Sequence, residues 1–236
     1  MREALDPLWY NPSGPVPKTG LTHAPMKTLI QCDFDGTITE DDASFYLLDA
    51  YAEGDWRSIL QQYKEGRITV GEFNTRAFAM IRQDEATLLA KLDEHVRVRP
   101  GFIELLDYCA NCGFRFVIVS NGLQFYIEAL LHKLDIQGIE VRAATNTFEP
   151  DGVKVQYIAP DGTVLQDGFK EAYTAKFLSE GYRVVYVGNG TSDSYASRHA
   201  HVVFATGDLL NYYQKHGLEC IPFDDLTDVV SGLTEL

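Results

Sequence analysis

Positive charge is scarce in this sequence. The 236 residues include 20 Lys and Arg against 34 Asp and Glu, which gives a formal net charge of −14. A protein that wraps nucleic acid or coats an anionic membrane uses clustered Lys and Arg to neutralise phosphate groups. The shortage therefore argues against both kinds of partner. A small anionic ligand remains compatible, provided that positive charge is concentrated where it binds.

Cysteines and long apolar runs are scarce as well. Four cysteines are too few for a disulfide framework in a chain of this length. No stretch approaches the roughly 20 apolar residues that span a bilayer, and none resembles the apolar segment of a secretory signal. We therefore expect a protein of the reducing cytoplasm that has no membrane partner and works as a monomer or homodimer.

Apolar side chains are plentiful enough for a sizeable core, since 45% of the residues are hydrophobic. Residues 1–25 are rich in proline and show no sustained periodicity, which predicts an N-terminal tail. From residue 28 onward, short β-branched or aromatic runs alternate with helical segments. Such alternation predicts an α/β fold with a three-layer, Rossmann-like parallel sheet.

The expected elements divide the chain further. Strands are predicted at 28–33, 114–120, 139–144, 182–188 and 200–205, with helices at 100–113 and 123–134. Between the first two strands, helical periodicity recurs at about 43–53, 55–64, 69–82 and 84–96. This pattern predicts a helical cap domain, residues 43–96, inserted into a core domain formed by residues 26–42 and 97–236. Pro-Asp-Gly occurs twice in residues 145–168, which predicts a β-hairpin or flap.

Polar residues follow the predicted strands at the sheet edge where ligands of α/β proteins bind. The first predicted strand is followed by Asp33, Asp35, Gly36 and Thr37. The second is followed by Ser120, Asn121 and Gly122, and the fourth by the segment from Gly188 to Asp193. Each group alone is commonly a turn or a helix cap. Two carboxylates at one strand tip repel each other, however, unless a cation or a reaction requires them. The combination therefore indicates a functional site.

These motifs resemble those of the haloacid dehalogenase superfamily, and in particular its phosphoserine-phosphatase-like members. "DFDGTIT" from Asp33 is similar to the first motif of the family, Ser120 to the second, Lys170 to the third and "GNGTSD" from Gly188 to the fourth. The resemblance covers about residues 27–205, and the helical insertion after the first motif is similar to the cap of that subgroup. It implies a phosphatase. Lys170 is preferred to Lys176 because it precedes the helix near the strand ends.

The resemblance also implies a chemistry. A carboxylate repels a phosphate, so Mg²⁺ is expected to intervene. Asp33 is implied as nucleophile and metal ligand, and Asp35 as the general acid, with its backbone carbonyl facing the metal. The implied phosphate-binding groups are Thr37, Ser120, Asn121 and Lys170. The implied metal ligands are Asp33, Asp35, Asn189 and Asp193.

One position departs from the family pattern. Asn189 stands where the family normally has an Asp that binds the metal, so the site offers a carbonyl oxygen there without a charge. Haloacid dehalogenases also carry Asn near this loop, but they lack the second acid of the first motif, which is Asp35 in this chain. Asp193 is expected either to join the metal or to orient a water bound to it.

The substrate implied by the resemblance is a small phosphomonoester. Asp42 and Arg76 are the candidates for gripping it from the cap, although an Arg at this register is displaced from the phosphoserine-phosphatase pattern. The runs "DFDGTITEDD" and "YKEGRITVGEF" are more similar to the methionine-salvage phosphatase that hydrolyses 2-hydroxy-3-keto-5-methylthiopentenyl 1-phosphate. Cap aromatics would suit a partly apolar substrate or would simply form the cap core. They are Phe45, Tyr46, Tyr63, Phe73 and Phe78.

Two alternatives stand beside this interpretation. One is a phosphate-binding regulatory pseudoenzyme of the same fold, in which Asn189 marks lost metal catalysis; the retained Asp33 and Asp35 argue against it. The other is a tyrosine-phosphatase loop, because Cys109 and Arg115 have the Cys-x5-Arg spacing. That loop is rejected, since Cys109 falls inside a predicted helix that Gly113 ends.

Overall fold

The computed structural model describes residues 27–236, so the predicted tail at residues 1–25 lies outside the described chain. Within these residues, eight strands form one sheet in the order β5-β4-β3-β2-β1-β6-β7-β8. The strands are β1 (Thr28–Cys32), β2 (Arg115–Leu123), β3 (Glu140–Glu149), β4 (Gly152–Ile158), β5 (Val164–Leu165), β6 (Arg183–Gly188), β7 (Val202–Ala205) and β8 (Ile221–Pro222). The predicted α/β fold with a mostly parallel sheet is confirmed.

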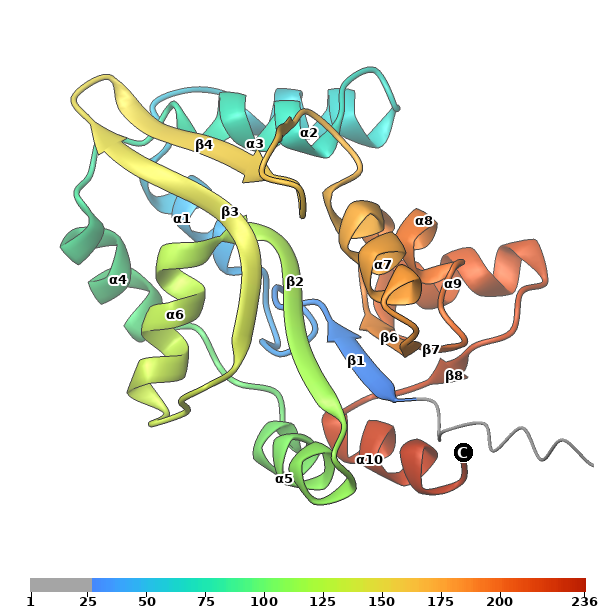
Figure 1. The fold of residues 1–236 in the computed structure, drawn as a ribbon. Helices are drawn as coiled ribbons and strands as arrows, with labels where there is room; N and C mark the ends of the chain where they lie inside the picture. The colour runs from blue at the N-terminus through green and yellow to red at the C-terminus, as the bar shows by residue number, and fades with distance from the viewer. Residues whose placement is uncertain (1–26) are drawn as a thin grey trace, which may run out of the picture.

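The centre of the sheet is parallel and buried. β1 pairs with β2 on one side and with β6 on the other, both in parallel register. The apolar run Leu29–Ile30 of β1 and the run 184–187 of β6 are fully buried, as expected for strands covered on both faces. The carboxyl ends of β1, β2 and β6 therefore lie next to one another at a single edge (Figure 1).

In the described part of the chain, ten α-helices accompany the strands. They are α1 (Ala43–Tyr51), α2 (Trp56–Lys64), α3 (Val70–Phe78), α4 (Glu85–Asp93), α5 (Phe102–Cys112), α6 (Gln124–Lys133), α7 (Phe169–Ser179), α8 (Ser194–Ser197), α9 (Gly207–His216) and α10 (Leu226–Thr234). α5 contacts β2 and α6 contacts β3, whereas α7 and α8 contact β6. Right-handed crossovers place these two groups on opposite faces of the sheet. Within residues 27–236, none of the helices is long and apolar enough to cross a membrane.

The helices α1 to α4, called here the helical insertion, begin where the sequence predicts them. Each starts after a side chain whose oxygen accepts a hydrogen bond from the backbone N–H three residues later. The four capping residues are Asp42, Asp55, Thr69 and Asp84. Such caps satisfy N–H groups that a helix leaves unpaired at its start, which explains why these helices begin there. The predicted α2 ends at residue 64, as observed, whereas the predictions for α1, α3 and α4 extend two to four residues past the observed ends, because the periodicity continues into the connecting turns.

The predicted flap is part of the main sheet. β3 pairs with β2 in parallel through its first half and with β4 in antiparallel through its second half. The separate strand and hairpin expected at 139–144 and 145–168 therefore share one continuous strand. In Figure 1 α3 lies along β4, and the Thr69 hydroxyl donates a hydrogen bond to the Gln166 carbonyl at 2.9 Å. The helical insertion thus rests on the flap.

The two ends of the helical insertion lie side by side. Thr39 and Val98 form an antiparallel bridge. The Glu40 N–H donates to the Arg97 carbonyl at 3.0 Å, and the Arg99 N–H donates to the Ile38 carbonyl at 2.8 Å. The chain therefore leaves and rejoins the sheet at one point, which keeps the sheet intact around the inserted helices.

Candidate active site

Asp33 begins the loop that follows β1. Its N–H continues the ladder by donating to the Val187 carbonyl at 2.9 Å, and the Phe34 carbonyl accepts three N–H groups from residues 37–39. Gly36 has φ +72°, and a Cβ there would lie 2.2 Å from Nδ2 of Asn189. Only glycine meets both conditions. The tight turn brings this loop against the loop after β6.

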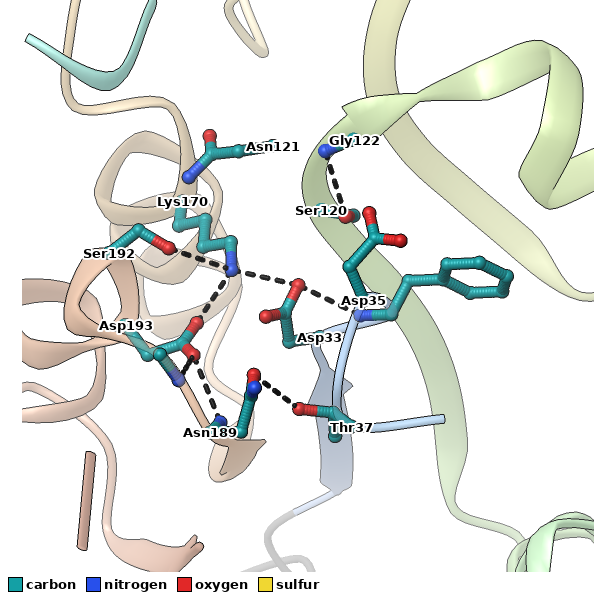
Figure 2. Close-up of polar contacts among 12 residues, drawn as sticks. Asp33, Asp35, Thr37, Ser120, Asn121, Gly122, Lys170, Asn189, Ser192 and Asp193 are labelled. Carbon is teal, nitrogen blue, oxygen red and sulfur yellow. Dashed lines mark hydrogen bonds and ion pairs between the residues drawn. The ribbon is translucent and has the colours of Figure 1, made fainter. Parts of the chain in front are cut away.

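Lys170 joins the first and fourth motifs. It is the second residue of α7, and its ammonium lies 2.8 Å from Oδ1 of Asp33 and 2.6 Å from Oδ1 of Asp193 (Figure 2). The carbonyl of Lys170 accepts a hydrogen bond from the buried Gln31 side chain of β1. Lys176, by contrast, lies on the surface and pairs with Glu180 at 2.6 Å. The structure therefore brings Lys170 to the site and leaves Lys176 outside it.

The ammonium of Lys170 and the carboxylates of Asp33 and Asp193 together carry a net charge of one negative unit. Lys170 is 1% exposed and Asp193 0%, so solvent does not screen them. Burial and the neighbouring Asp193 raise the pKa of Asp33 to about 7, although Lys170 opposes the shift. Burial alone would lower the pKa of Lys170, but the Asp193 and Asp33 carboxylates outweigh it and raise that pKa. The lysine is therefore charged, and the surplus negative charge favours a bound cation or a proton.

Asp193 organises the loop after β6. Its Oδ1 accepts from Lys170 and from the buried Tyr186 hydroxyl at 2.7 Å, and its Oδ2 accepts from the N–H groups of Asn189 at 3.1 Å and Gly190 at 2.8 Å. A carboxylate offers about four lone-pair sites, so these four donors occupy it. This geometry favours a positioning role for Asp193 over direct contact with a metal.

Asn189 faces the first motif from across the site. Its Oδ1 accepts a hydrogen bond from the Thr37 hydroxyl at 3.0 Å (Figure 2). A carbonyl oxygen has a second lone pair, so the same atom can also contact a cation. Across residues 27–236, no three His, Cys, Asp or Glu side chains gather in a metal-binding arrangement. Because four donors occupy the oxygens of Asp193, the groups in this part of the site that can face an ion are the Asp33 carboxylate and the amide oxygen of Asn189.

This donor set fits Mg²⁺. The ion prefers oxygen ligands and is commonly held by only one or two carboxylates, with waters and substrate phosphate as its other ligands. Oδ1 of Asp33 already accepts from Lys170 and from the Phe34 N–H at 2.8 Å, which leaves Oδ2 for a cation or a phosphorus atom. The surplus negative charge of the site favours the same ion.

The second motif forms a bulge in β2. Val119 pairs with Arg142 and Leu123 with Ala144, so four steps along β2 match two along β3. The expected strand end at residue 120 is therefore wrong, and β2 continues to Leu123 with residues 120–122 displaced. The Gly122 N–H donates to the Ser120 hydroxyl oxygen at 3.0 Å. The hydroxyl proton of Ser120 is left for another acceptor, such as a phosphate oxygen.

Asp35 lies on the Ser120 side of the site, partly buried. Its Oδ1 accepts the N–H of Ala43 at 3.0 Å, and its Oδ2 accepts the hydroxyl of Tyr126 at 2.5 Å. Burial and then the nearby Asp42 carboxylate raise the pKa of Asp35 well above its usual range, against the effect of Tyr126. A carboxyl group that tends to keep its proton suits a general acid.

Asn121 is hydrogen-bonded to both the helical insertion and the flap. Its backbone carbonyl accepts from Nδ2 of Asn74 in α3 at 3.0 Å and from the hydroxyl of Tyr157 in β4 at 2.7 Å. The side chain lies above Lys170 in Figure 2, and its buried Oδ1 has no hydrogen-bond partner in the described part of the chain. Buried polar atoms in proteins are almost always paired. This atom is therefore a candidate to bind a donor group of a ligand.

The two substrate residues predicted in the cap lie in different surroundings. Asp42 caps α1 and lines a surface pocket of about 580 Å³ with Phe45 and Tyr46, and burial raises its pKa to about 6. Arg76 lies on the exposed side of α3, where its guanidinium contacts Glu72 at 3.3 Å. The structure therefore places Asp42 beside the site loop and Arg76 on the surface.

The predicted cap aromatics divide into two groups. Phe73 and Phe78 are buried in the core, which agrees with the structural interpretation of these side chains. Phe45, Tyr46 and Tyr63 are partly buried and pack against that core. Burial raises the pKa of Tyr63 to about 12, and Lys170 and Asp193 also act on its hydroxyl, so Tyr63 is the aromatic in electrostatic range of the site.

Several residues that contact the site lie outside the four sequence motifs. Tyr126 and Tyr186 donate to Asp35 and Asp193, and Asn74 and Tyr157 hold the carbonyl of Asn121. Arg99 donates to the carbonyls of residues 36, 37 and 224 at 2.7–2.8 Å, which fixes the loop after β1. A tyrosine within an otherwise apolar run is the available signal, because its hydroxyl needs a partner when buried. The sequence does not show which partner.

The four cysteines are free thiols. Cys109 lies buried within α5, and Gly113 ends that helix with φ +67°. The rejection of a tyrosine-phosphatase loop is confirmed, because a helical Cys109 cannot sit in a phosphate-binding loop.

Comparisons with known proteins show the family of this chain. The model of the family "haloacid dehalogenase-like hydrolase" matches residues 30–198. Two similar proteins are each named 2-hydroxy-3-keto-5-methylthiopentenyl-1-phosphate phosphatase. The one from Exiguobacterium sp. strain AT1b is 24% identical, with 86% of this chain and 96% of the relative covered. The one from Geobacillus kaustophilus is 27% identical, with 87% and 94% covered.

Solved structures support the same fold. A phospho-aspartyl intermediate analogue of phosphoserine phosphatase has a TM-score of 0.65 and 20% identity, covering 87% of this chain and 98% of that chain. The phosphoserine phosphatase from T. onnurineus, solved in complex with NDSB-201, has a TM-score of 0.64 and 20% identity, covering 91% and 99%. At this identity the likeness concerns the arrangement of helices and strands.

Proposed function

Because the chain belongs to the haloacid dehalogenase-like hydrolases and is a phosphoric monoester hydrolase of that family, we propose that it dephosphorylates a small metabolite through a phosphoryl-aspartate on Asp33. The observation that carries this mechanism is the placement of the Asp33 carboxylate. One of its oxygens is held by Lys170 and the Phe34 N–H, while the other is left for attack on phosphorus. A carboxylate held in this way is an oriented nucleophile.

The proposed reaction has two steps. Oδ2 of Asp33 forms a bond to phosphorus as the bond from phosphorus to the leaving oxygen breaks, and Asp35 gives its proton to that oxygen. A water molecule then attacks phosphorus, Asp35 takes the water proton, and the Asp33 carboxylate is released with inorganic phosphate. The raised pKa of Asp35 favours the protonated form that the first step requires.

The phosphate group is proposed to lie among the hydroxyls of Thr37 and Ser120, the Asn121 loop and the Lys170 ammonium. Lys170 offsets the negative charge of the phosphoryl oxygens, and Ser120 has a hydroxyl proton to donate. Asp33, Asn189 and the carbonyl of Asp35 would hold Mg²⁺, which would supply charge neutralisation between carboxylate and phosphate. Because Oδ2 of Asp33 is the nucleophile, the ion would share Oδ1 in place of Lys170, whose ammonium would then serve the phosphoryl oxygens. Asp193 is proposed to keep Lys170 and the Asn189 loop in place.

The helical insertion is proposed to be a cap domain that sets the substrate class. Asp33 is 5% exposed and Ser120 1%, so a substrate reaches them only when the covering segments move. A covered site suits a small soluble phosphomonoester. We favour 2-hydroxy-3-keto-5-methylthiopentenyl 1-phosphate of methionine salvage over phosphoserine, because the partly buried Tyr63 lies within electrostatic range of Lys170 and Asp193 and Arg76 lies on the surface.

Replacing Asp33 with Asn tests the mechanism. With 4-nitrophenyl phosphate and Mg²⁺, we expect D33N to lose at least about 10⁴-fold in kcat, because the amide cannot form the covalent intermediate. The variant D107N, at an exposed aspartate of α5, serves as the matched control and should keep parent activity. Thermal unfolding should show D33N to be folded, since the change removes a surplus buried charge. Near-parent activity in D33N would refute the covalent mechanism, and an inactive parent would favour the phosphate-binding pseudoenzyme.

A further inference from the structure

Tyr126 is the residue outside the motifs that lies closest to the proposed acid. It is 3% exposed in α6, the helix that follows the second motif. Its hydroxyl lies 2.5 Å from Oδ2 of Asp35 and 2.8 Å from the hydroxyl of Ser44. While Asp35 is ionised, its carboxylate can only accept, so Tyr126 donates to Asp35 and Ser44 donates to Tyr126. When Asp35 carries the proton, the same two contacts can persist with the donors reversed, so Tyr126 holds the carboxyl group in both forms.

The same carboxyl group is held from its other side by α1. Oδ1 of Asp35 accepts the N–H of Ala43, the first residue of that helix, and Ser44 is the second. The start of the helical insertion thus contacts Asp35 twice, once directly and once through Tyr126. A carboxyl group held at both oxygens has a defined direction, which one held at a single oxygen does not.

The contact between Tyr126 and Asp35 depends on the absence of a side chain at Gly122. A Cβ on Gly122 would lie 2.0 Å from the Tyr126 hydroxyl oxygen and 2.3 Å from Oδ2 of Asp35. Any side chain there would push the two groups apart. Gly122 has no positive φ to explain the glycine, so the close approach of Tyr126 to Asp35 is what its lack of a side chain permits.

We infer that Tyr126 is a positioning residue for the general acid, an inference that rests on the proposed function. Tyr126 aims the Asp35 carboxyl at the leaving oxygen while α1 is docked. When α1 moves away, Ala43 and Ser44 leave with it and Asp35 loses two of the contacts that orient it. Proton delivery is therefore tied to the docked position of the helical insertion.

The leaving group distinguishes this role from simple packing. An alkoxide needs a proton from the acid as it departs, whereas 4-nitrophenolate is a stable anion that departs without one. The ratio kcat/KM covers only the steps up to the first irreversible bond cleavage, so the later use of Asp35 as a base does not enter it. A misaimed acid should lower kcat/KM for an alkyl phosphate far more than for an aryl phosphate.

The experiment compares Tyr126→Phe with the parent enzyme on glycerol 2-phosphate and on 4-nitrophenyl phosphate. We expect kcat/KM to fall about 10- to 100-fold for the alkyl ester and less than about threefold for the aryl ester, a part of the 10²- to 10⁴-fold that general acids supply. Ser44→Ala should shift the same ratio in the same direction by a smaller factor. Tyr213→Phe is the matched control, because Tyr213 is another buried tyrosine with one hydroxyl partner, Ser197, in a separate apolar cluster.

The double variant with Asp35→Asn completes the test. Once the acid is absent, Tyr126→Phe should cause no further alkyl-selective loss, because two residues that act as one unit have non-additive effects. Equal losses on both substrates in Tyr126→Phe, or an undiminished selective loss in the Asp35→Asn background, would overturn the inference. A parent enzyme without activity on either ester would instead refute the proposed function.

Discussion

Asn189 shows how one amide changes the charge of the proposed metal site. With Asn at this position, Asp33 is the single carboxylate facing the proposed ion, because Asp193 is occupied by four donors. The missing charge weakens the attraction for a hard cation, and it also reduces the repulsion of an incoming phosphate. The Thr37 hydroxyl offsets part of the weaker attraction for the cation, since its hydrogen bond holds the amide oxygen of Asn189 toward the first motif.

Asn189→Asp should therefore tighten the metal site. We expect the Mg²⁺ concentration for half-maximal activity to fall about 3- to 10-fold, because the site gains a second carboxylate. The same change should lower the stability of the metal-free protein, since it adds to the surplus negative charge. Titration calorimetry with Mg²⁺ measures the affinity without turnover. An unchanged affinity would mean that residue 189 is not a ligand.

The raised pKa of Asp33 predicts how stability depends on pH. Its ordinary value is 3.8 and its value in the fold is about 7, so between these the native state binds more protons than the unfolded state. The contribution of Asp33 is therefore fully present below pH 4 and is lost as pH rises to 7, with a total on the order of 4 kcal/mol. Urea unfolding of the metal-free protein at pH 5 and pH 8 measures it.

The matched control for the pH dependence is D33N, which removes the titrating group. The difference in unfolding free energy between parent and D33N should change between pH 5 and 8, while carboxylates elsewhere cancel from the comparison. Saturating Mg²⁺ should reduce the loss at pH 8, because the ion competes with the proton. A parent and a D33N variant with parallel pH profiles would contradict a raised pKa of Asp33.

Residues within one short motif were predictable, and their partners from distant segments were not. Asp33, Asp35 and Thr37 lie within five positions of one another after a buried run, so spacing alone places them at one strand tip. Tyr126 reaches the site through the packing of α6 and Tyr186 through the register of β6, which the local sequence does not specify. Asn189 was correctly expected near the first motif, but its bond to Thr37 depends on the tight turn at Gly36.

At the scale of elements, a small hydrogen-bond network joins three parts of the molecule. Asn74 of α3 donates to the Asn121 carbonyl at 3.0 Å and to the Tyr157 hydroxyl at 2.6 Å, and Tyr157 donates to the same carbonyl. The helical insertion, the flap and the second motif therefore meet at one backbone oxygen. This contact keeps α3 docked over the site.

Asn74→Ala should loosen that docking. Removing a buried donor leaves the Asn121 carbonyl with one partner fewer, which costs about 1–3 kcal/mol. We expect faster hydrogen exchange in α3 and a fall in kcat/KM of about tenfold. Thr75→Ala, an exposed neighbour on the same helix, is the control and should change neither. Unaltered exchange in α3 of the Asn74 variant would show that other contacts hold the helix.

Long periodic elements were easier to predict than short or composite ones. The caps of α1 to α4 lie in the sequence as Asp or Thr just before each apolar repeat, and those helices begin as predicted. The two-residue strand β8 is too short to produce a pattern. The joining of the flap to β3 depends on pairing with β2 and β4 at once, which is a property of the sheet and not of residues 139–168.

For the whole molecule, burial of the site predicts selectivity by size. Asp33 and Lys170 are almost fully buried, so a phosphate on a folded protein cannot reach them unless the surrounding segments move, and in the proposed function the segment that moves is the helical insertion. We expect the intact protein to hydrolyse small phosphomonoesters with kcat/KM at least about 10³-fold above that for a phosphoserine in a folded protein. Phosphate release assays on both substrates measure the ratio.

A variant in which a short Gly-Ser linker replaces residues 43–96 supplies the comparison. The kcat/KM values of this variant for different small phosphomonoesters should lie within about tenfold of one another. Its kcat/KM values should also be lower than those of the parent, because the hydrogen bond from Ala43 to Asp35 and the one between Ser44 and Tyr126 are lost. Circular dichroism checks that the sheet is retained. A variant that keeps the substrate ranking of the parent would show that specificity resides outside the helical insertion.

The bridge between Thr39 and Val98 has a consequence for how such a protein changes over generations. An inserted segment whose ends already touch closes one loop, and lengthening that loop adds little entropic penalty. Recombination or indels within the insertion can therefore be inherited without disturbing the register of β1, β2 and β6. The first turn of α1 and Asn74 are the exceptions, because they contact Asp35 and the Asn121 loop. A lineage is thus free to acquire new substrates through the rest of the insertion while these few positions stay under selection.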